Sequence, residues 1–502
     1  MSACKNIGGR RHPAGRVWHP AKRSSRQALN RCYVICLLGT ALVTPVAAEK
    51  PARQQGGSRQ PVQTSTASEV PAHAFDVILG RPTGTSITVS VLYYSDAEGC
   101  IRYGIQPGKL ALKTPARLFK KGEPATIELS GLKPDTCYYY QLEWAQTKSG
   151  EASFHTARPP GGTFTFTVTA DSHLDDRTVP ALYQQTLTNA LADKPDFHID
   201  LGDTFMTEKH ANREAAAKQY LAQRYYLSPL CQSVPLFLAL GNHDGENPSG
   251  RGNDAESTSL WANAMRKRYF PNPEPNSFYS GDTTAHPDAG LLEDYCAWQW
   301  GDALFIVLDP YWHTRKPRGK GDSWSHTLGD DQYQWLKRTL ENSRAKFKLV
   351  FIHQLLGGGG DACRGGAESA PFYEWGGQSA DGSGDFKQNR PGWPLPIHSL
   401  LVQNKVSIVF HGHDHFYAKQ DLDGMIYQEV PQPGTPANGS APRSAAEYGY
   451  LDGTILGGPG HLRVGISPQQ ITVDCLRSAV LPQDGTKVTN RQVAHAYTVP
   501  SR

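Results

Sequence analysis

Cysteine is scarce in this chain, and this limits the kinds of site that it can build. Nine cysteines occur among 502 residues, and the six beyond residue 48 lie far apart from one another. None of these six has the short spacing of a cysteine zinc site, which excludes such a site. The even count permits disulfide bonds, and we expect Cys100 and Cys137 to pair because both fall in one small β-rich segment.

Long hydrophobic runs are also missing. Residues 1–31 are basic without an acidic side chain, Cys32–Thr44 is a short apolar stretch, and Val46–Ala48 offers small side chains for cleavage. This pattern is typical of a secretory signal peptide over residues 1–48, with a retained signal anchor as the alternative. No later segment approaches the roughly 20 apolar residues of a membrane helix. We therefore expect an exported protein, periplasmic or extracellular, with no membrane span in the mature chain.

The mature chain has no excess of positive charge. The formal net charge is +4, and residues 1–48 hold eight lysines or arginines and no acidic residue, so removing these eight charges takes it to −4. Proteins dedicated to nucleic acid carry a basic stripe or face, and none is visible here. This argues against nucleic acid as a dedicated partner, and the sequence leaves the oligomeric state open.

The composition changes several times along the mature chain. After a stretch rich in Gln, Ser, Thr and Pro come short alternating strands such as Ser86–Tyr93, and beyond Pro159–Gly162 apolar strands alternate with helices. The predicted helices are Ala181–Ala192, Glu208–Tyr226 and Asp331–Ser343. The predicted segments are a flexible linker at 49–73, a β-domain at 74–158, an α/β domain at 163–476 and a polar, fraying tail at 477–502.

Polar clusters follow five apolar runs of the α/β domain. Each run is short and rich in β-branched or aromatic residues, as in Phe164–Thr169 and Leu349–Ile352, which indicates buried strands. Ligands bind at such strand ends in sheets with crossover helices. Alone, each cluster would be read as a turn, a capped helix or a core histidine, but their joint order favours one site. The clusters are Asp171 to His173, Gly202 and Asp203, Gly241 to Asp244, His353, and Gly412 to His415.

These residue types match the needs of phosphate ester hydrolysis. Two metal ions roughly 3.5–4 Å apart can neutralise the phosphoryl oxygens, position a water or hydroxide for attack and lower its pKa. Such a pair needs a bridging oxygen, which a carboxylate such as Asp203 can supply. Manganese, iron and zinc accept the mixture of imidazole and carboxylate found here. We expect two divalent or trivalent ions of this kind per chain.

In this order the clusters resemble the site of the calcineurin-like metallophosphoesterase superfamily. With the preceding β-domain, the chain is most similar to the purple acid phosphatase-like branch, over roughly Phe75 to Val480. The segment Leu132–Tyr138 resembles the turn and strand of a fibronectin type III-like sandwich. The resemblance implies an α/β fold, a four-layer α/β/β/α sandwich, preceded by a small all-β fibronectin III-like sandwich.

The resemblance also implies roles for single residues. One metal would take Asp171, His173, Asp203 and His415, and the other would take Asp203, Asn242, His353 and His413. Asp203 would then bridge the two ions. His243 would be the unligated imidazole beside the phosphate, where it could stabilise the phosphoryl oxygens or protonate the leaving alkoxide. Asp244 could orient His243 or simply cap its loop.

Two positions depart from the purple acid phosphatase pattern. That family has a tyrosine that binds ferric iron three residues after the bridging aspartate, and this chain has Met206 there. The family also has glycine where this chain has His173. His173 can occupy the coordination position that the tyrosine would have taken. We therefore expect a colourless or weakly coloured enzyme, and we do not assume a ferric centre.

Three functions are compatible with these residues. The first is an exported, acid phosphatase-like phosphomonoesterase that attacks a small phosphate ester with a metal-bound water or hydroxide. The second is a phosphodiesterase acting on nucleotides, phospholipid head groups or wall polymers, and the third is a non-catalytic exported binding protein. A glycine-rich insertion at 357–395 could act as a lid, and its Arg364 is either a phosphate contact or a structural residue.

Overall fold

The structure is a computed structural model, and it describes residues 69–250, 255–317, 322–358, 363–436, 440–480 and 488–501. The predicted signal peptide and most of the predicted linker lie outside this part of the chain. Within it, no helix combines the length and the apolar character needed to cross a membrane.

The N-terminal region is an all-β sandwich. One sheet has the order β1-β2-β6, and the other has the order β4-β3-β7-β8, with β5 and β9 paired to β3 and β7. Val89 and Leu142 belong to one buried cluster between the two sheets. The strands are β1 (Phe75–Gly80), β2 (Ser86–Tyr93), β3 (Ala97–Gly104), β4 (Leu112–Lys113), β5 (Arg117–Phe119), β6 (Ala125–Ser130), β7 (Cys137–Trp144), β8 (Thr147–Lys148) and β9 (Ala152–His155).

The predicted disulfide between Cys100 and Cys137 is wrong, and both thiols are free. The register of β3 and β7 places Cys100 opposite Glu143, while Cys137 faces His155 on the other side of β7. Glu143 and Cys137 are therefore separated by about 20 Å along the strand, at about 3.3 Å per residue. A disulfide needs Cα atoms within about 7 Å.

Two further sheets face each other in the remainder of the chain. The first has the order β12-β11-β10-β21-β22-β23, and the second has the order β13-β14-β15-β16-β17-β19-β18-β20. The strands of the first sheet are β10 (Phe164–Thr169), β11 (Phe197–Asp200), β12 (Leu236–Leu238), β21 (Gly460–Ile466), β22 (Gln470–Arg477) and β23 (Val493–Pro500). Those of the second are β13 (Ser280–Gly281), β14 (Cys296–Trp300), β15 (Ala303–Val307), β16 (Phe347–Phe351), β17 (Ile408–His411), β18 (Tyr417–Leu422), β19 (Met425–Glu429) and β20 (Thr454–Leu456).

Aromatic side chains fill the space between the two sheets. Phe166 of β10 meets Phe305 of β15 edge to face, with ring centroids 5.2 Å apart. The neighbours of Phe305 on its strand, Leu304 and Ile306, belong instead to a cluster on the opposite face of β15. Both faces of β15 are therefore buried, which explains its continuous apolar sequence.

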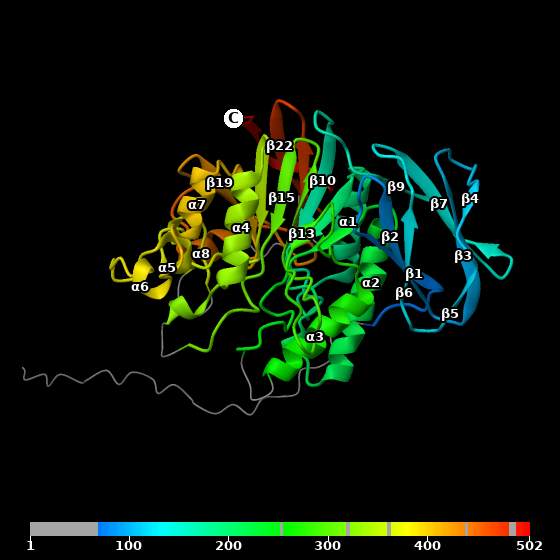
Figure 1. The fold of residues 1–502 in the computed structure, drawn as a ribbon, viewed down its shortest axis with the longest axis horizontal. Coiled ribbons are helices and arrows are strands. Elements are labelled where there is room, and N and C mark those ends of the chain that lie inside the picture. The colour runs from blue at the N-terminus through cyan, green and yellow to red at the C-terminus, as the bar shows by residue number, and fades with distance from the viewer. Residues whose placement is uncertain are drawn as a thin grey trace, which may run out of the picture. The chain divides into compact units, whose positions relative to one another are not determined.

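Helices cover the outer faces of both sheets, which completes the four layers (Figure 1). Side chains of α1 and α2 pack with β12 of the first sheet, and side chains of α4, α5 and α7 pack on the second sheet. The helices are α1 (Pro180–Ala192), α2 (Arg213–Cys231), α3 (Ala255–Tyr269), α4 (Asp330–Asn342), α5 (Tyr373–Gly376), α6 (Phe386–Asn389), α7 (Ile397–Gln403) and α8 (Ala441–Glu447), with short 3-10 helices η2 (Thr207–Lys209), η3 (Ser323–Ser325) and η5 (Ala367–Ser369). The predicted α/β/β/α sandwich with a preceding β-domain is confirmed.

The prediction of a fraying C-terminal tail is wrong for Val493–Pro500. These residues form β23, which pairs antiparallel with β22 at the edge of the first sheet. Val499 lies in the core between the sheets and is 6% exposed. From Ala496 to Pro500, exposed residues alternate with the partly buried Tyr497 and the buried Val499, as expected for a half-buried edge strand. The polar composition of the segment gave no sign of this strand in the sequence.

A buried carboxylate ties the C-terminal strands to α1. Asp193 accepts a hydrogen bond from His461 at 2.7 Å and pairs with Arg463 and Arg491 at 3.2 and 2.6 Å. Burial alone would raise the pKa of Asp193, but the hydrogen bond from His461 and the two guanidinium charges outweigh it and lower the pKa.

This cluster predicts a pH-dependent contribution to stability. Because the folded pKa of Asp193 lies below the unfolded value of about 3.9, its stabilisation is present at neutral pH and is lost as the pH falls through the folded pKa. Asp193→Asn should lower the free energy of unfolding by about 1.5–3 kcal/mol at pH 7. Urea titrations should show this difference shrinking below about pH 4. Asp474 is the more exposed carboxylate that pairs with Arg463. Asp474→Asn should lower the free energy of unfolding by less than about 1 kcal/mol.

Candidate metal centre

Parallel strands bring the polar clusters to one edge of the two sheets. Strands β10, β11 and β12 run parallel, and so do β15, β16 and β17. Their carboxyl ends therefore lie at a common edge, where loops can meet. The side chains that follow these strands are Asp171 and His173 after β10, Asp203 after β11, Asn242, His243 and Asp244 after β12, His353 after β16, and His413 and His415 after β17.

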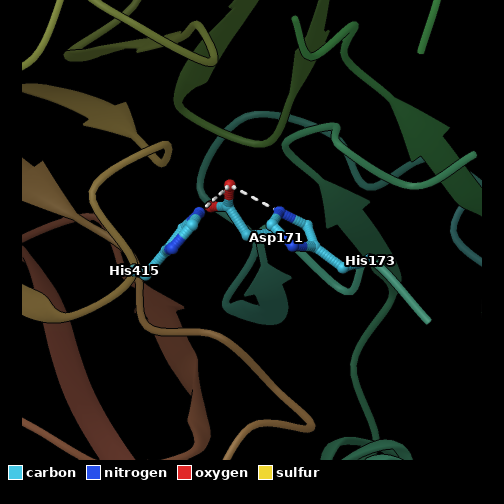
Figure 2. A group of neighbouring side chains, drawn as sticks. All are labelled: Asp171, His173 and His415. Carbon is cyan, nitrogen blue, oxygen red and sulfur yellow. Dashed lines mark ion pairs between the residues drawn. The ribbon is translucent and has the colours of Figure 1, made fainter. Parts of the chain in front are cut away.

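The first group of donors centres on Asp171. Its Oδ1 atom lies 3.6 Å from His173 Nε2 and 3.4 Å from His415 Nε2. Figure 2 shows the two imidazoles approaching this carboxylate from opposite sides. Ligand atoms of all three residues lie within 4.8 Å of one another, which is compatible with a single metal ion.

The second group consists of Asp203, His353 and His413, whose ligand atoms also lie within 4.8 Å of one another. Asn242 joins it, because its Oδ1 atom lies 3.2 Å from His353 Nε2. Asp203 Oδ2 is 3.5 Å from His353 Nε2 and 3.4 Å from His173 Nε2 of the first group. One carboxylate oxygen thus faces both groups, as a bridging ligand requires.

Asp171 and Asp203 each have one carboxylate oxygen that accepts a hydrogen bond from a backbone amide. The amide of His413 donates to Asp171 Oδ2 at 2.9 Å, and the amide of His243 donates to Asp203 Oδ1 at 2.7 Å. His353 is fixed similarly, since its Nδ1 atom lies 2.8 Å from the carbonyl oxygen of Leu201. These contacts leave Asp171 Oδ1, Asp203 Oδ2 and His353 Nε2 directed at the centre of the site.

Three ligand atoms that face the centre of the site lack a hydrogen-bond partner within the described residues. The three atoms are Asp171 Oδ1, Asp203 Oδ2 and His173 Nε2, and all are buried. Buried polar atoms without such partners cost free energy, so their presence at one point calls for an explanation. Oxygen and nitrogen donors 3.4–3.6 Å apart fit around cations of the manganese, iron or zinc type.

The backbone at these positions is strained. Asp171, His173, Asp203, His413 and His415 all have positive φ angles, between 55° and 80°. Non-glycine residues rarely adopt this left-handed region, and they do so mostly where the surrounding structure enforces it at functional sites. Most of the predicted ligands are therefore held in costly conformations that aim their side chains into the site.

Glycine allows two of the loops to touch. A Cβ atom on Gly241 would lie 2.0 Å from the amide nitrogen of Asp203 and 2.3 Å from its Oδ1 atom. Packing therefore requires glycine at this position of the Gly-Asn-His-Asp cluster, because only glycine lets the loop after β12 lie against the loop after β11.

The electrostatics of the site favour ionised carboxylates. Burial alone would raise the pKa of Asp171 and of Asp203, but nearby imidazoles, chiefly His353, outweigh it and lower both pKa values. Burial lowers the pKa of His413 and His415, which keeps these imidazoles neutral and ready to donate a lone pair. For His353, burial is outweighed by the charges of Asp203 and Asp171, which raise its pKa to about 9. Anionic oxygens are thus concentrated where a cation would be stabilised.

His243 lies beside the donor groups without belonging to either. Its Nε2 atom is 4.0 Å from Asp203 Oδ2, and its Nδ1 atom is 2.7 Å from Glu208 Oε1. Burial alone would raise the pKa of Glu208, but the hydrogen bond with His243 outweighs it and lowers the pKa. An ionised carboxylate at Nδ1 fixes the ring so that Nε2 faces the donor groups.

The orienting role considered for Asp244 falls to Glu208 in this structure. Asp244 is buried, and its carboxylate accepts hydrogen bonds from the backbone amides of Gly241, Asp203, Thr204 and Phe205 at 2.7–3.0 Å. It therefore caps the loop that carries Asp203 and ties it to Gly241, in the loop that carries His243. Sequence reasoning missed Glu208 because it lies on η2, at no recognised spacing from the clusters.

Arg364 of the glycine-rich insertion also reaches the site. Its Nη1 atom donates to the carbonyl oxygen of His413 and, at 3.1 Å, to Asp414 Oδ1, and its guanidinium lies 4.7 Å from the centre of the Tyr448 ring. The same side chain lines a cavity together with His173, His243 and His415. Arg364 thus has a structural contact and a position facing the candidate substrate site.

The sequence model of the calcineurin-like phosphoesterase family matches residues 164–417, which include all the clusters. The chain belongs to this family. It is accordingly a metal-dependent phosphoester hydrolase. None of the curated protein sequences compared matches the chain.

Solved structures that share the fold of this phosphoesterase include one of PhoD and one of a purple acid phosphatase. A structure of PhoD aligns over 89% of this chain and 92% of its own, with a TM-score of 0.61 and 16% identity. The purple acid phosphatase PPD1 from seeds of yellow lupin (Lupinus luteus) aligns over 85% of this chain and 74% of its own, with a TM-score of 0.58 and 17% identity. At these identities the similarity concerns the fold, and it covers the N-terminal β-region as well as the two central sheets.

The contact between Glu208 and His243 leads to a testable expectation. Glu208→Gln should lower kcat about tenfold, because the imidazole loses the carboxylate that fixes its orientation. KM and metal content should change little, since Glu208 belongs to neither donor group. Steady-state kinetics would test this, with Glu214→Gln at the exposed start of α2 as the matched control. An unchanged kcat would show that His243 is oriented by other contacts.

Proposed function

We propose that this chain is an exported phosphomonoesterase that holds two metal ions with seven side chains. The observation that carries the proposal is the pair of three-residue donor groups that meet at Asp203 Oδ2. The ligands would be Asp171, His173, Asp203 and His415 for one ion, and Asp203, Asn242, His353 and His413 for the other. Bound there, the ions would neutralise the phosphoryl oxygens and lower the pKa of the attacking water.

The remaining groups of the site act on the substrate. His243 is placed to donate from Nε2 to a phosphoryl oxygen or to the leaving oxygen, with Glu208 holding the opposite side of its ring. Arg364 supplies positive charge on the wall of the adjoining cavity, which suits the dianion of a monoester. Asp244 keeps the loop of Asp203 in place through its four amide contacts.

Phosphodiester hydrolysis is the second candidate, and a second cavity favours it. This cavity has a volume of about 240 Å³ and is lined by Asn242 and Glu208 of the site. It shares His210 and Ala211 with the larger cavity beside His173. A diester carries two substituents on phosphorus, and two adjoining cavities could hold one each.

Hydrolysis of paired substrates tests the proposal. The mature protein, loaded with manganese, iron or zinc, would be assayed with nitrophenyl phosphate and with bis(nitrophenyl) phosphate. Faster turnover of the monoester is expected, and faster turnover of the diester would favour the second candidate. Two bound ions without hydrolysis of either ester would contradict both candidates and favour the binding-protein hypothesis.

Export leads to its own prediction. Because Val46–Ala48 offers the small side chains that signal peptidase prefers, the secreted chain should begin at Glu49. Mass spectrometry of the protein recovered from the periplasm or the medium would identify its first residue. A chain that keeps residues 1–48 and remains with the membrane would support the retained signal anchor instead.

A further inference from the structure

A cavity of about 370 Å³ adjoins the candidate metal centre. Its lining includes His173 and His415 of the first donor group, together with His243. The cavity is therefore continuous with the place where the ester would be cleaved. Its volume lies at the lower end of the range found for small-molecule sites.

One part of this cavity is built from apolar side chains. Leu174 and Met206 line it and are 1% and 5% exposed, and Ala211 and Ala215 line it from the loop before α2 and from the first turn of α2. The small alanine side chains leave room that larger residues would fill. A polar alcohol such as glycerol or a sugar would find few partners on this wall, whereas an alkyl or aryl group would be removed from water there.

The direction of His243 indicates which part of a substrate enters the cavity. Its Nδ1 atom is occupied by Glu208, and its Nε2 atom faces Asp203. A donor to the leaving oxygen must lie on the leaving-group side of the phosphorus atom, and the cavity is lined by this same imidazole. With His243 acting as the donor to the leaving oxygen, the alcohol part of the ester extends past His243 into the cavity.

We propose that the cavity lined by Leu174, Met206, Ala211 and Ala215 binds the alcohol part of the substrate and selects phosphate esters with an apolar alkyl or aryl group. This specificity rests on the proposed phosphoesterase function and names the substrate class of the same site. Charged side chains of both signs line the other parts of the cavity, namely Arg177, Lys209, Arg364, Asp175 and Asp176. Arg177 is paired with Asp175 at 2.8 Å.

A series of primary alkyl phosphates tests this specificity. From ethyl to octyl phosphate the leaving alcohols have nearly equal acidity, so differences in kcat/KM report how the enzyme binds the alkyl group. For the metal-loaded wild-type protein, kcat/KM should rise about threefold for each added methylene until the cavity is full, and glycerol phosphate should resemble the shortest ester. Equal kcat/KM for all chain lengths would overturn the specificity and leave the proposed function intact, whereas no hydrolysis of any ester would contradict the proposed function.

A pair of matched variants locates the effect in the cavity. Ala215→Phe places a ring in the cavity and should abolish the dependence on chain length. Ala217→Phe is the control, because Ala217 lies on the same helix with similar partial exposure and is not among the lining residues. An unchanged dependence on chain length in Ala215→Phe would overturn the assignment of the cavity.

Inhibition of the wild-type protein provides a test that requires no variant to fold. Alkylphosphonates are not cleaved, so their inhibition constants report binding alone. The constants should fall about threefold for each added methylene, in parallel with the rise in kcat/KM for the esters. Constants that do not depend on chain length would overturn the proposed apolar subsite.

Discussion

Replacement of His243 by alanine should lower kcat by about a hundredfold or more while the metal content stays at the wild-type level. His243 lies next to the donor groups, with Nε2 4.0 Å from Asp203 Oδ2, but it belongs to neither of them. Loss of a group that donates a proton or stabilises developing charge typically costs a factor of 10²–10⁴. The measurement is kcat for nitrophenyl phosphate together with elemental analysis of the same sample.

The control for this substitution is His286→Ala. His286 is a partly exposed histidine that belongs to neither donor group and lines neither cavity of the site. It should keep both turnover and metal content. Loss of a metal ion from His243→Ala would identify His243 as a ligand, and unchanged turnover would remove it from the mechanism.

Replacement of Asp203 by alanine should remove both metal ions and reduce turnover by more than about a thousandfold. Its Oδ2 atom lies 3.4 Å from His173 Nε2 and 3.5 Å from His353 Nε2, so one oxygen serves both donor groups. Bound metals contribute several kcal/mol to phosphoryl transfer, and each 1.36 kcal/mol corresponds to a factor of ten.

Asp200→Asn is the matched control for Asp203. Asp200 is equally buried and lies three residues earlier, but its Oδ1 atom accepts hydrogen bonds from Gly202 and Thr204 instead of facing the donor groups. This variant should keep its metal ions. Retention of one firmly bound ion by Asp203→Ala would show that the two groups do not share the carboxylate.

Much of the fold and of the site could be predicted from the sequence because both depend on local patterns. Short apolar runs predicted the strands that end before Asp171, Asp203 and His353, and the helices α1 and α4 begin within one residue of their predicted positions. In parallel sheets these strand ends share an edge, so the order of the clusters predicted that they would meet. The assignment of seven ligands within them rested on the resemblance to the metallophosphoesterase superfamily.

The features that the sequence did not reveal depend on register and on contacts between distant residues. The pairing of Cys100 opposite Glu143 follows from the register of two strands, which the cysteine count could not indicate. The contact of Glu208 with His243 joins two loops that are 35 residues apart. The apolar cavity likewise combines Leu174, Met206 and Ala215 from three separate segments.

The number of metal ions bound per chain tests the proposed two-metal centre most directly. Elemental analysis of the purified protein, before and after removal of metals with a chelator, should give two ions per chain and then none. Ester hydrolysis should disappear with the ions and return when manganese, iron or zinc is added back. A single ion at saturation, or hydrolysis that survives complete removal of the metals, would contradict the two-metal centre.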